Sequence, residues 1–291
     1  MSDVLSQLLI QGLNGIQYGL LLFLVASGLT LVFGVMGVIN LAHGSFYMLG
    51  AYLAFLFFEL TGSLFLAILI AVPITIAAGY LLEATLFRPL YIRDHLYQVL
   101  LTYGLILVLD ELRRLAFGND VHGIKVPALF DFSIPLTQTL NYPAFRIVIS
   151  VICLIIAGAL YLLIQRTRLG MIVRAGSTNR EMVQSLGIDI NLVYRVLFAL
   201  GAALAAFAGM IAAPVTTVFP GMGNEVLIIS FVVVVIGGIG SIKGAFVGSL
   251  LVGLADTFGQ VFVPSLSGMA VYVVMAAVLI WRPTGLYGSP K

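Results

Sequence analysis

Three polar residues lie close together in sequence where two long apolar segments of the chain meet. Asn40, His43 and Ser45 stand in the stretch GVMGVINLAHGSF, bracketed by Gly34, Gly37 and Gly44. Polar side chains at membrane depth are costly unless they face the interior of a helical bundle or a solute pathway. An imidazole can also exchange a proton near neutral pH. The triplet therefore predicts either contact with a transported solute or hydrogen bonding between helices.

The other reactive residue types form no recognisable catalytic or metal-binding pattern. The histidines, at positions 43, 95 and 122, are far apart in sequence and lack the spacing of a metal site. No nucleophile stands beside a candidate base. Cys153 is the single cysteine, so no disulfide can form within the chain. We therefore expect no enzymatic activity, no catalytic residues, no metal site and no cofactor bound to this chain.

A second glycine-rich stretch, VVVVIGGIGSIKGAFVG, lies in the last third of the chain. Its spacing does not match a dinucleotide-binding loop, and Lys243 lacks the following Ser or Thr of a phosphate-binding loop. Small residues four apart instead let helices approach closely. Glycine-interrupted segments in two halves of a chain also indicate a transporter with internal repeats. We predict helix breaks or close helix contacts at Gly237, Gly238, Gly240 and Gly244.

The polar stretch from Arg166 to Asn191 contains the pattern of a short helix. Thr178-Asn179-Arg180-Glu181 fits a capping box in which Thr178 is the N-cap and Glu181 reaches back to its backbone. Gly187 supplies the left-handed residue that commonly ends a helix. Such a short helix is marginal alone and needs packing, for which it offers Met182, Val183 and Leu186. The residues fit equally a helix that docks on a partner and one that lies against its own bundle.

The elements that position these residues are long apolar segments. Of 291 residues, 61% are hydrophobic and 9% are charged, so the chain cannot cover its surface with polar groups. Apolar runs of about 18 residues or more can cross a bilayer as helices. Such runs lie near residues 8–33, 44–60, 64–87, 96–117, 144–165, 192–213, 225–241, 244–263 and 268–281. We predict an all-α, polytopic transmembrane bundle of about 8–10 spans, with glycine-interrupted helices and an arrangement compatible with inverted repeats.

The positive charges are distributed unevenly along this pattern, and they predict its orientation. Lys and Arg are enriched in cytoplasmic loops. With the N-terminus outside and the C-terminus in the cytoplasm, ten of them fall inside: Arg88, Arg93, Arg166, Arg168, Arg174, Arg180, Arg195, Lys243, Arg282 and Lys291. Only Arg113, Arg114, Lys125 and Arg146 fall outside. The outer segment from Gly118 to Tyr142 fits either a contact with an external partner or, as we favour, a plain connection. A net charge of +2 indicates no nucleic-acid partner.

Four stretches resemble the permease family of branched-chain amino-acid ABC transporters, and in particular its LivH-like inner-membrane subunits. They are GLTLVFGVMGVINLAHGSFYMLGAY (28–52), EATLFRPL (83–90), LGMIVRAGSTNREMVQSLGIDI (169–190) and VIGGIGSIKGAFVGSLLVGLAD (235–256). The resemblance implies a multi-pass permease domain over residues 1–291, set in the lipid of the bacterial inner membrane. It would move branched-chain or related amino acids with energy from separate subunits. The implied partners are a second related permease, two cytoplasmic ATPase subunits that bind ATP and Mg²⁺, and a periplasmic substrate-binding protein.

The resemblance also implies roles for particular residues. The cytoplasmic segment 166–191 would couple the permease to an ATPase subunit through Arg174, Thr178, Asn179, Glu181 and Gly187. The triplet Asn40, His43 and Ser45 would line part of the substrate pathway. After Asp256 the chain continues TFGQVFVPSLSGM, which is shorter and less polar than in typical relatives. Because related permeases also serve urea, short amides and other small solutes, this departure leaves the substrate open.

Two other classes of function compete with an ATP-driven importer. An ion-coupled secondary carrier would need ionisable residues at membrane depth, of which Asp256 is one candidate. A membrane scaffold or assembly protein would move no solute. Neighbouring genes for two ATPases, a second permease and a secreted binding protein would favour the importer.

Overall fold

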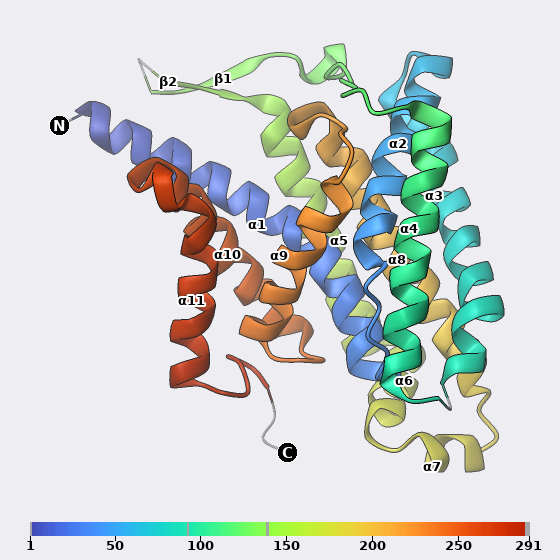
Figure 1. Cartoon of the computed structure of the whole chain (residues 1–291). Helices are drawn as coiled ribbons and strands as arrows, with labels where there is room; N and C mark the ends of the chain where they lie inside the picture. Colours follow the sequence, from blue (N-terminus) through green and yellow to red (C-terminus); the bar gives the residue numbers. More distant parts are fainter. Residues whose placement is uncertain (1, 92, 138–139, 289–291) are drawn as a thin grey trace.

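The apolar segments of the sequence form the helices of a computed structural model, which describes residues 2–91, 93–137 and 140–288 (Figure 1). Each of the nine predicted spans corresponds to a helix. These helices are α1 (Ser2–Met36), α2 (His43–Thr61), α3 (Leu64–Leu82), α4 (His95–Phe117), α5 (Ala144–Arg166), α8 (Ile190–Thr216), α9 (Met222–Gly237), α10 (Ile242–Phe262) and α11 (Ser267–Trp281). The prediction of an all-α bundle is confirmed.

Six helical segments within the described part of the chain are long and apolar enough to cross a membrane. They cover residues 7–36, 43–61, 64–90, 144–166, 190–216 and 242–262. Helices α9 and α11 are apolar but shorter, with 16 and 15 residues. At about 1.5 Å per residue each covers roughly 24 Å, less than a hydrocarbon core of about 30 Å. The chain is therefore a multi-pass membrane protein with both full-length and shortened apolar helices.

Helices α1 and α8 form the centre of the bundle. In their most apolar windows 78% and 83% of the residues are buried, against 28% in α3, α5 and α10. The two helices cross at Gly28 and Gly201, where a Cβ atom on Gly28 would lie 2.6 Å from the carbonyl oxygen of Gly201. No larger residue fits there without moving a backbone, so small residues set the closeness of the central crossing.

The contacts between helices repeat in the two halves of the chain. Helices α1 and α8 run in opposite directions (Figure 1), and their crossing is matched by a close contact between Gly44 of α2 and Gly223 of α9. Helix α3 packs on α2 and α8, while α10 packs on α9 and α1. Exchanging α1, α2 and α3 for α8, α9 and α10 thus preserves these contacts. This agrees with the predicted inverted repeat. The exchange matches the α1–α2 junction with the α8–α9 junction, and not with the glycine-rich turn between α9 and α10 that the sequence suggested.

The two ends of the bundle carry different structures (Figure 1). At the end where α1 begins, strand β1 (Ser133–Thr137) follows the 3₁₀ turn η3 (Ala128–Phe130) and pairs antiparallel with strand β2 (Leu140–Pro143). We call this the hairpin end. The expectation of a plain connection over residues 118–142 was wrong, since Pro135 and Pro143 mask the strand pattern. At the opposite end lie α6 (Arg168–Thr178), α7 (Arg180–Ser185) and the end of α11.

The positive charges separate between these two ends. Nine described residues of the predicted cytoplasmic group lie near the end that carries α6 and α7: Arg88, Arg93, Arg166, Arg168, Arg174, Arg180, Arg195, Lys243 and Arg282. The four of the opposite group, Arg113, Arg114, Lys125 and Arg146, lie near the hairpin end. The tenth, Lys291, falls outside the described residues. The fold therefore brings nine positive charges, which are spread over many loops in the sequence, to one end of the bundle.

Glycines shape the breaks between helices and several close backbone contacts. Between α1 and α2 the backbone of residues 37–42 is not helical, and Gly37 has φ 67°. In the turn between α9 and α10, Gly238 and Gly240 have φ 96° and 82°, a region that favours glycine. The remaining predicted glycines make close backbone contacts instead, namely Gly34 with Gly240, Gly44 with Gly223, and Gly237 with Gly244.

Candidate functional site

The polar segment between α5 and α8 folds as two helices rather than one. The N-cap of α7 is Asn179, whose Oδ1 accepts a hydrogen bond from the Met182 backbone N–H at 3.0 Å. Thr178 ends α6 instead, and its hydroxyl donates to the Arg174 carbonyl at 3.2 Å. The predicted capping box with Thr178 as N-cap was therefore wrong by one residue, because the preceding helix takes Thr178.

Helix α6 was not predicted, because two glycines lower the helix propensity of its sequence. Packing against the end of α5 overrides that preference. The Thr167 side chain caps α6 by accepting from the Gly170 backbone N–H at 3.2 Å. Gly170 lies against the Ile164 backbone with no room for a Cβ atom, and the Arg174 guanidinium donates to the Ile164 carbonyl. Helix α6 is thus folded back tightly on α5.

The predicted apolar face of α7 divides between the bundle and the surface. Val183 is 3% exposed and packs inward, whereas Met182 and Leu186 are 64% and 73% exposed. Met171 of α6 is exposed as well. The helix ends at Ser185, and Gly187 follows with φ 79°, the left-handed residue that was predicted to stop it. The exposed residues Met171, Met182 and Leu186, which no described part of the chain covers, form what we call the apolar surface of α6 and α7.

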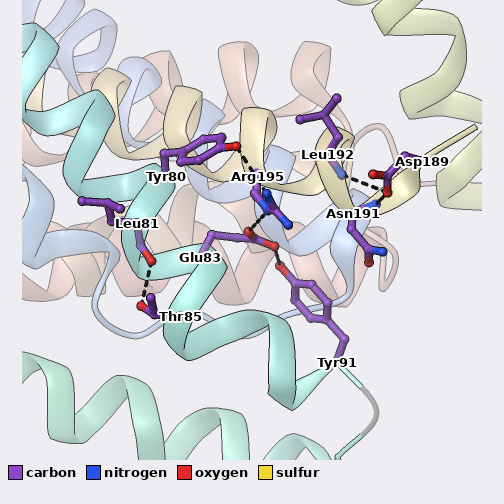
Figure 2. Close-up of polar contacts among 9 residues, drawn as sticks. All are labelled: Tyr80, Leu81, Glu83, Thr85, Tyr91, Asp189, Asn191, Leu192 and Arg195. Atoms are coloured by element: carbon purple, nitrogen blue, oxygen red, sulfur yellow. Dashed lines mark hydrogen bonds and ion pairs between the residues drawn. The ribbon is translucent and has the colours of Figure 1, made fainter.

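A buried carboxylate joins the end of α3 to the start of α8 (Figure 2). Glu83 opens the π-helical turn η1 (Glu83–Phe87), just before the 3₁₀ turn η2 (Arg88–Leu90), and is 0% exposed. The Tyr91 hydroxyl donates to Glu83 Oε1 at 2.6 Å, and Arg195 Nε lies 3.3 Å from Oε2. The Arg195 guanidinium also donates to the Tyr80 hydroxyl at 3.3 Å. A buried charge requires such partners, so they fix Glu83 in place.

Helix α7 meets this cluster through Arg180. Its guanidinium carbon lies 5.1 Å from the ring centre of Tyr194 and 5.8 Å from that of Tyr91, within the range of cation–π contacts. The two rings pack edge to face, 5.4 Å apart. Burial, and then the hydrogen bond to Glu83, raise the pKa of Tyr91, so its hydroxyl keeps its proton and donates. Cation, rings and carboxylate thus form one connected group.

This group was not predicted from the sequence. Its members come from four separate segments, and no spacing rule connects them. One signal was available: the charged residues of EATLFRPL directly follow the apolar run of α3, where an acidic side chain near a membrane span needs a partner. Only the fold shows that the partners are Tyr91 and Arg195.

The polar triplet lies inside the chain, where α1 passes into α2. Asn40 and His43 are each 1% exposed and Ser45 is 4% exposed. With a proton on Nε2, His43 donates to the Val25 carbonyl of α1 at 3.0 Å, and Asn40 Oδ1 accepts from the Ala42 backbone N–H at 3.1 Å. In this conformation His43 therefore connects α2 to α1, and Asn40 stabilises the turn between them.

Among the described residues, the remaining polar candidates form neither a metal site nor a catalytic site. Within the described ranges no group of three or more His, Cys, Asp or Glu side chains could hold a metal ion. Asp256 is partly buried in α10, where its Oδ2 accepts a hydrogen bond from Gln260, one turn later, at 2.8 Å. The geometry thus indicates a helical bundle with an exposed apolar surface at one end.

Comparison with known proteins gives a consistent result over the whole chain. The family model described as "Branched-chain amino acid transport system / permease component" matches residues 12–281. The chain is 33% identical to the high-affinity branched-chain amino acid transport system permease protein BraD of Pseudomonas aeruginosa, over 97% of this chain and 96% of BraD. It is 30% identical to the corresponding permease protein LivH of Escherichia coli K12, over 100% and 99% of the two chains.

A second kind of permease protein also matches. LivM of Escherichia coli K12, likewise named a permease of a high-affinity branched-chain amino acid transport system, is 29% identical over 89% of this chain and 66% of LivM. No solved structure matches the chain.

Proposed function

The chain belongs to the family of permease components of branched-chain amino acid transport systems, and we propose that it is the membrane-spanning permease subunit of an ATP-driven importer. The proposed cargo is a branched-chain or related amino acid. The observation that carries this proposal is the similarity to BraD and LivH from end to end, over a fold that is helical and multi-pass. The chain itself is a transport subunit and not an enzyme.

The energy would come from two ATPase subunits that bind ATP and Mg²⁺ in the cytoplasm. A second permease would pair with this one, and a periplasmic binding protein would deliver the amino acid. The similarity to both LivH and LivM supports a pair of related permeases. The nine-to-four separation of positive charges supports the orientation, with α6 and α7 in the cytoplasm and the hairpin end outside.

The coupling contact would lie on the apolar surface of α6 and α7. Large apolar side chains at a polar, basic end of a membrane protein mark a site for another protein. Met182 and Leu186 stand four residues apart on the exposed side of α7, the spacing with which a helix presents apolar side chains to the groove of a partner. Around the apolar surface, Asn179, Glu181 and Gly187 are exposed and available to the same partner. Closure of the ATPase dimer would then push α7 against the bundle.

The coupling contact is tested by placing a charge in it. Leu186→Asp should prevent the ATPase subunits from co-purifying with the permease, because a carboxylate would be buried without a partner. Leu129→Asp is the matched control, since Leu129 is 76% exposed and lies in η3 near the hairpin end. Equal retention of the ATPase subunits by both variants would contradict the docking assignment.

The polar triplet is proposed to serve the substrate pathway in a conformation that separates α1 from α2. Asn40, His43 and Ser45 are buried here, so they can meet a solute only when the α1–α2 junction opens. His43→Ala should then lower substrate uptake while the complex still assembles. Loss of assembly alone, with normal uptake by the complexes that do form, would leave His43 with only its hydrogen bond to Val25.

The whole proposal is tested by transport into vesicles that contain the purified complex. Uptake of radiolabelled leucine, isoleucine or valine should require ATP, Mg²⁺ and the binding protein, and should persist when ion gradients are dissipated. Urea and short amides serve as competing substrates, because related permeases carry them. Uptake driven by an ion gradient without ATP would instead identify a secondary carrier, and no uptake at all would favour a scaffold.

A further inference from the structure

The contacts of α7 with the bundle are few. Val183 and Arg180 supply the side-chain contacts that hold it: Val183 is buried, and Arg180 lies over two tyrosine rings. A non-directional apolar contact such as that of Val183 lets a helix slide. A cation over two ring faces resists displacement, because the attraction depends on its position above the rings.

The two tyrosines under Arg180 lead to three different helices. Tyr194 belongs to α8, and its hydroxyl donates to the Val35 carbonyl in the last turn of α1 at 3.4 Å. Tyr91 follows η2, and its hydroxyl donates to Glu83 at the end of α3. The Arg195 guanidinium then connects Glu83 back to α8. One side chain of α7 therefore touches a group that includes the ends of α1 and α3 and the start of α8.

This group connects helices that must move relative to one another if the permease rocks between states. Helices α1 and α8 are its central pair, and α3 packs directly on α8. The Arg180 guanidinium lies over the Tyr91 ring. From there the Tyr91 hydroxyl binds Glu83, and Glu83 pairs with Arg195 (Figure 2). Each of these contacts has a preferred geometry. A displacement of α7 would move the rings and, through them, the buried carboxylate.

We propose that Arg180 is a positioning residue that transmits the movement of α7 to the junction of α1, α3 and α8 through Tyr91, Tyr194 and Glu83. Its role is distinct from docking, because Arg180 faces the bundle whereas the apolar surface formed by Met171, Met182 and Leu186 faces outward. The inference rests on the proposed function, since it presumes that an ATPase subunit pushes α7. It also gives a function to the EATLFRPL stretch, because Glu83 of that stretch binds both Tyr91 and Arg195.

The test separates attachment of the ATPase from transmission. Arg180→Ala should leave the ATPase subunits bound and hydrolysing ATP, while substrate uptake per ATP hydrolysed falls by about tenfold. That factor corresponds to about 1.4 kcal/mol, between the strengths of an exposed and a desolvated cation–π contact, as suits the half-buried Arg180. Arg180→Lys keeps a cation above the rings and should recover part of the loss. Arg93→Ala is the matched control, because Arg93 is an exposed arginine at the same end whose side chain makes no described hydrogen bond or ion pair.

Several outcomes would overturn the inference. Wild-type uptake per ATP in Arg180→Ala would show that α7 acts without this contact. Loss of the ATPase subunits from Arg180→Ala would make Arg180 a docking residue instead. Absence of ATPase subunits from the wild-type complex would be different, since it would refute the proposed function itself.

A second variant keeps the test decisive if Arg180→Ala does not fold. Tyr91→Phe retains the ring beneath Arg180 and removes only the hydroxyl that binds Glu83. It should fold, retain the ATPase subunits and lower uptake per ATP by a smaller factor than Arg180→Ala would. Wild-type uptake per ATP in Tyr91→Phe would break the proposed chain at its second contact and overturn the inference.

Discussion

Replacing Gly28 with alanine should loosen the central crossing of α1 and α8. A Cβ atom at this position would lie 2.6 Å from the Gly201 carbonyl oxygen and 3.0 Å from the Gly201 Cα atom. Because carbon–oxygen contacts ordinarily begin at about 3.3 Å, the two helices must separate by roughly 0.7 Å. The third close atom is His43 Cε1, at 3.0 Å. The two Gly201 atoms belong to backbone, so no side-chain rotation relieves those contacts.

The size of the effect follows from two opposing contributions. Overpacking a core costs about 1–3 kcal/mol. Alanine regains up to about 1 kcal/mol of helix propensity over glycine. With two rigid helices in contact we take the upper end of the cost, which leaves a net loss of about 2 kcal/mol and a Tm lowered by roughly 4–8 °C.

The chain offers a graded set of control variants. Gly104 lies within α4, and a Cβ atom there meets nothing within 4 Å, so Gly104→Ala should raise the Tm by roughly 2–4 °C through helix propensity alone. Gly201→Ala should fall between the two, since its Cβ atom would approach the Gly28 carbonyl oxygen only to 3.0 Å. Thermal unfolding of the purified variants in one detergent measures the order. A Gly28→Ala protein as stable as Gly104→Ala would refute the close crossing.

Two further predictions concern α7 and the orientation of the chain. Asn179→Ala should speed amide hydrogen exchange in α7 about fivefold, because an N-cap contributes about 1 kcal/mol, while Thr178→Ala should leave that exchange unchanged. The reverse result would restore Thr178 as the cap. With α6 and α7 in the cytoplasm, Asn119→Cys should react with a membrane-impermeant maleimide on intact cells, and Ser185→Cys should react only after the membrane is opened. The native Cys153 is 0% exposed and should give no background. Labelling of Ser185→Cys alone on intact cells would invert the topology.

Helices and breaks could be predicted well from the sequence because the signals are local. A run of apolar residues is helical wherever it lies in a bilayer, since the backbone must satisfy its own hydrogen bonds there. A left-handed backbone at Gly187 or Gly238 is favoured by glycine itself. Where two local signals compete, prediction was less sharp. Thr178 and Asn179 are both good N-caps, and the preceding helix α6 decided between them by extending through Thr178.

The site was harder to predict because it depends on contacts between distant segments. The apolar face of α7 was visible in the sequence, but only packing decided that Val183 points inward while Met182 and Leu186 remain exposed. The partners of Glu83 lie 8 and 112 residues away, and no local rule connects a carboxylate to Tyr91 and Arg195. The choice between a docking helix and one lying on its own bundle is answered for one face only. Val183 and Arg180 lie against the bundle, whereas docking through the exposed Met182 and Leu186 stays a prediction.

The sequence by itself determined that this protein is a helical membrane permease, because hydropathy, glycine positions and the order of four family motifs are properties of the linear chain. Tertiary structure alone decided how its halves meet, through small residues such as Gly28 and Gly201, and how α7 contacts the bundle. The physical reason is the range of the interactions. Transfer of an apolar segment into lipid depends on that segment alone, whereas an ion pair or a backbone contact depends on where the rest of the chain lies.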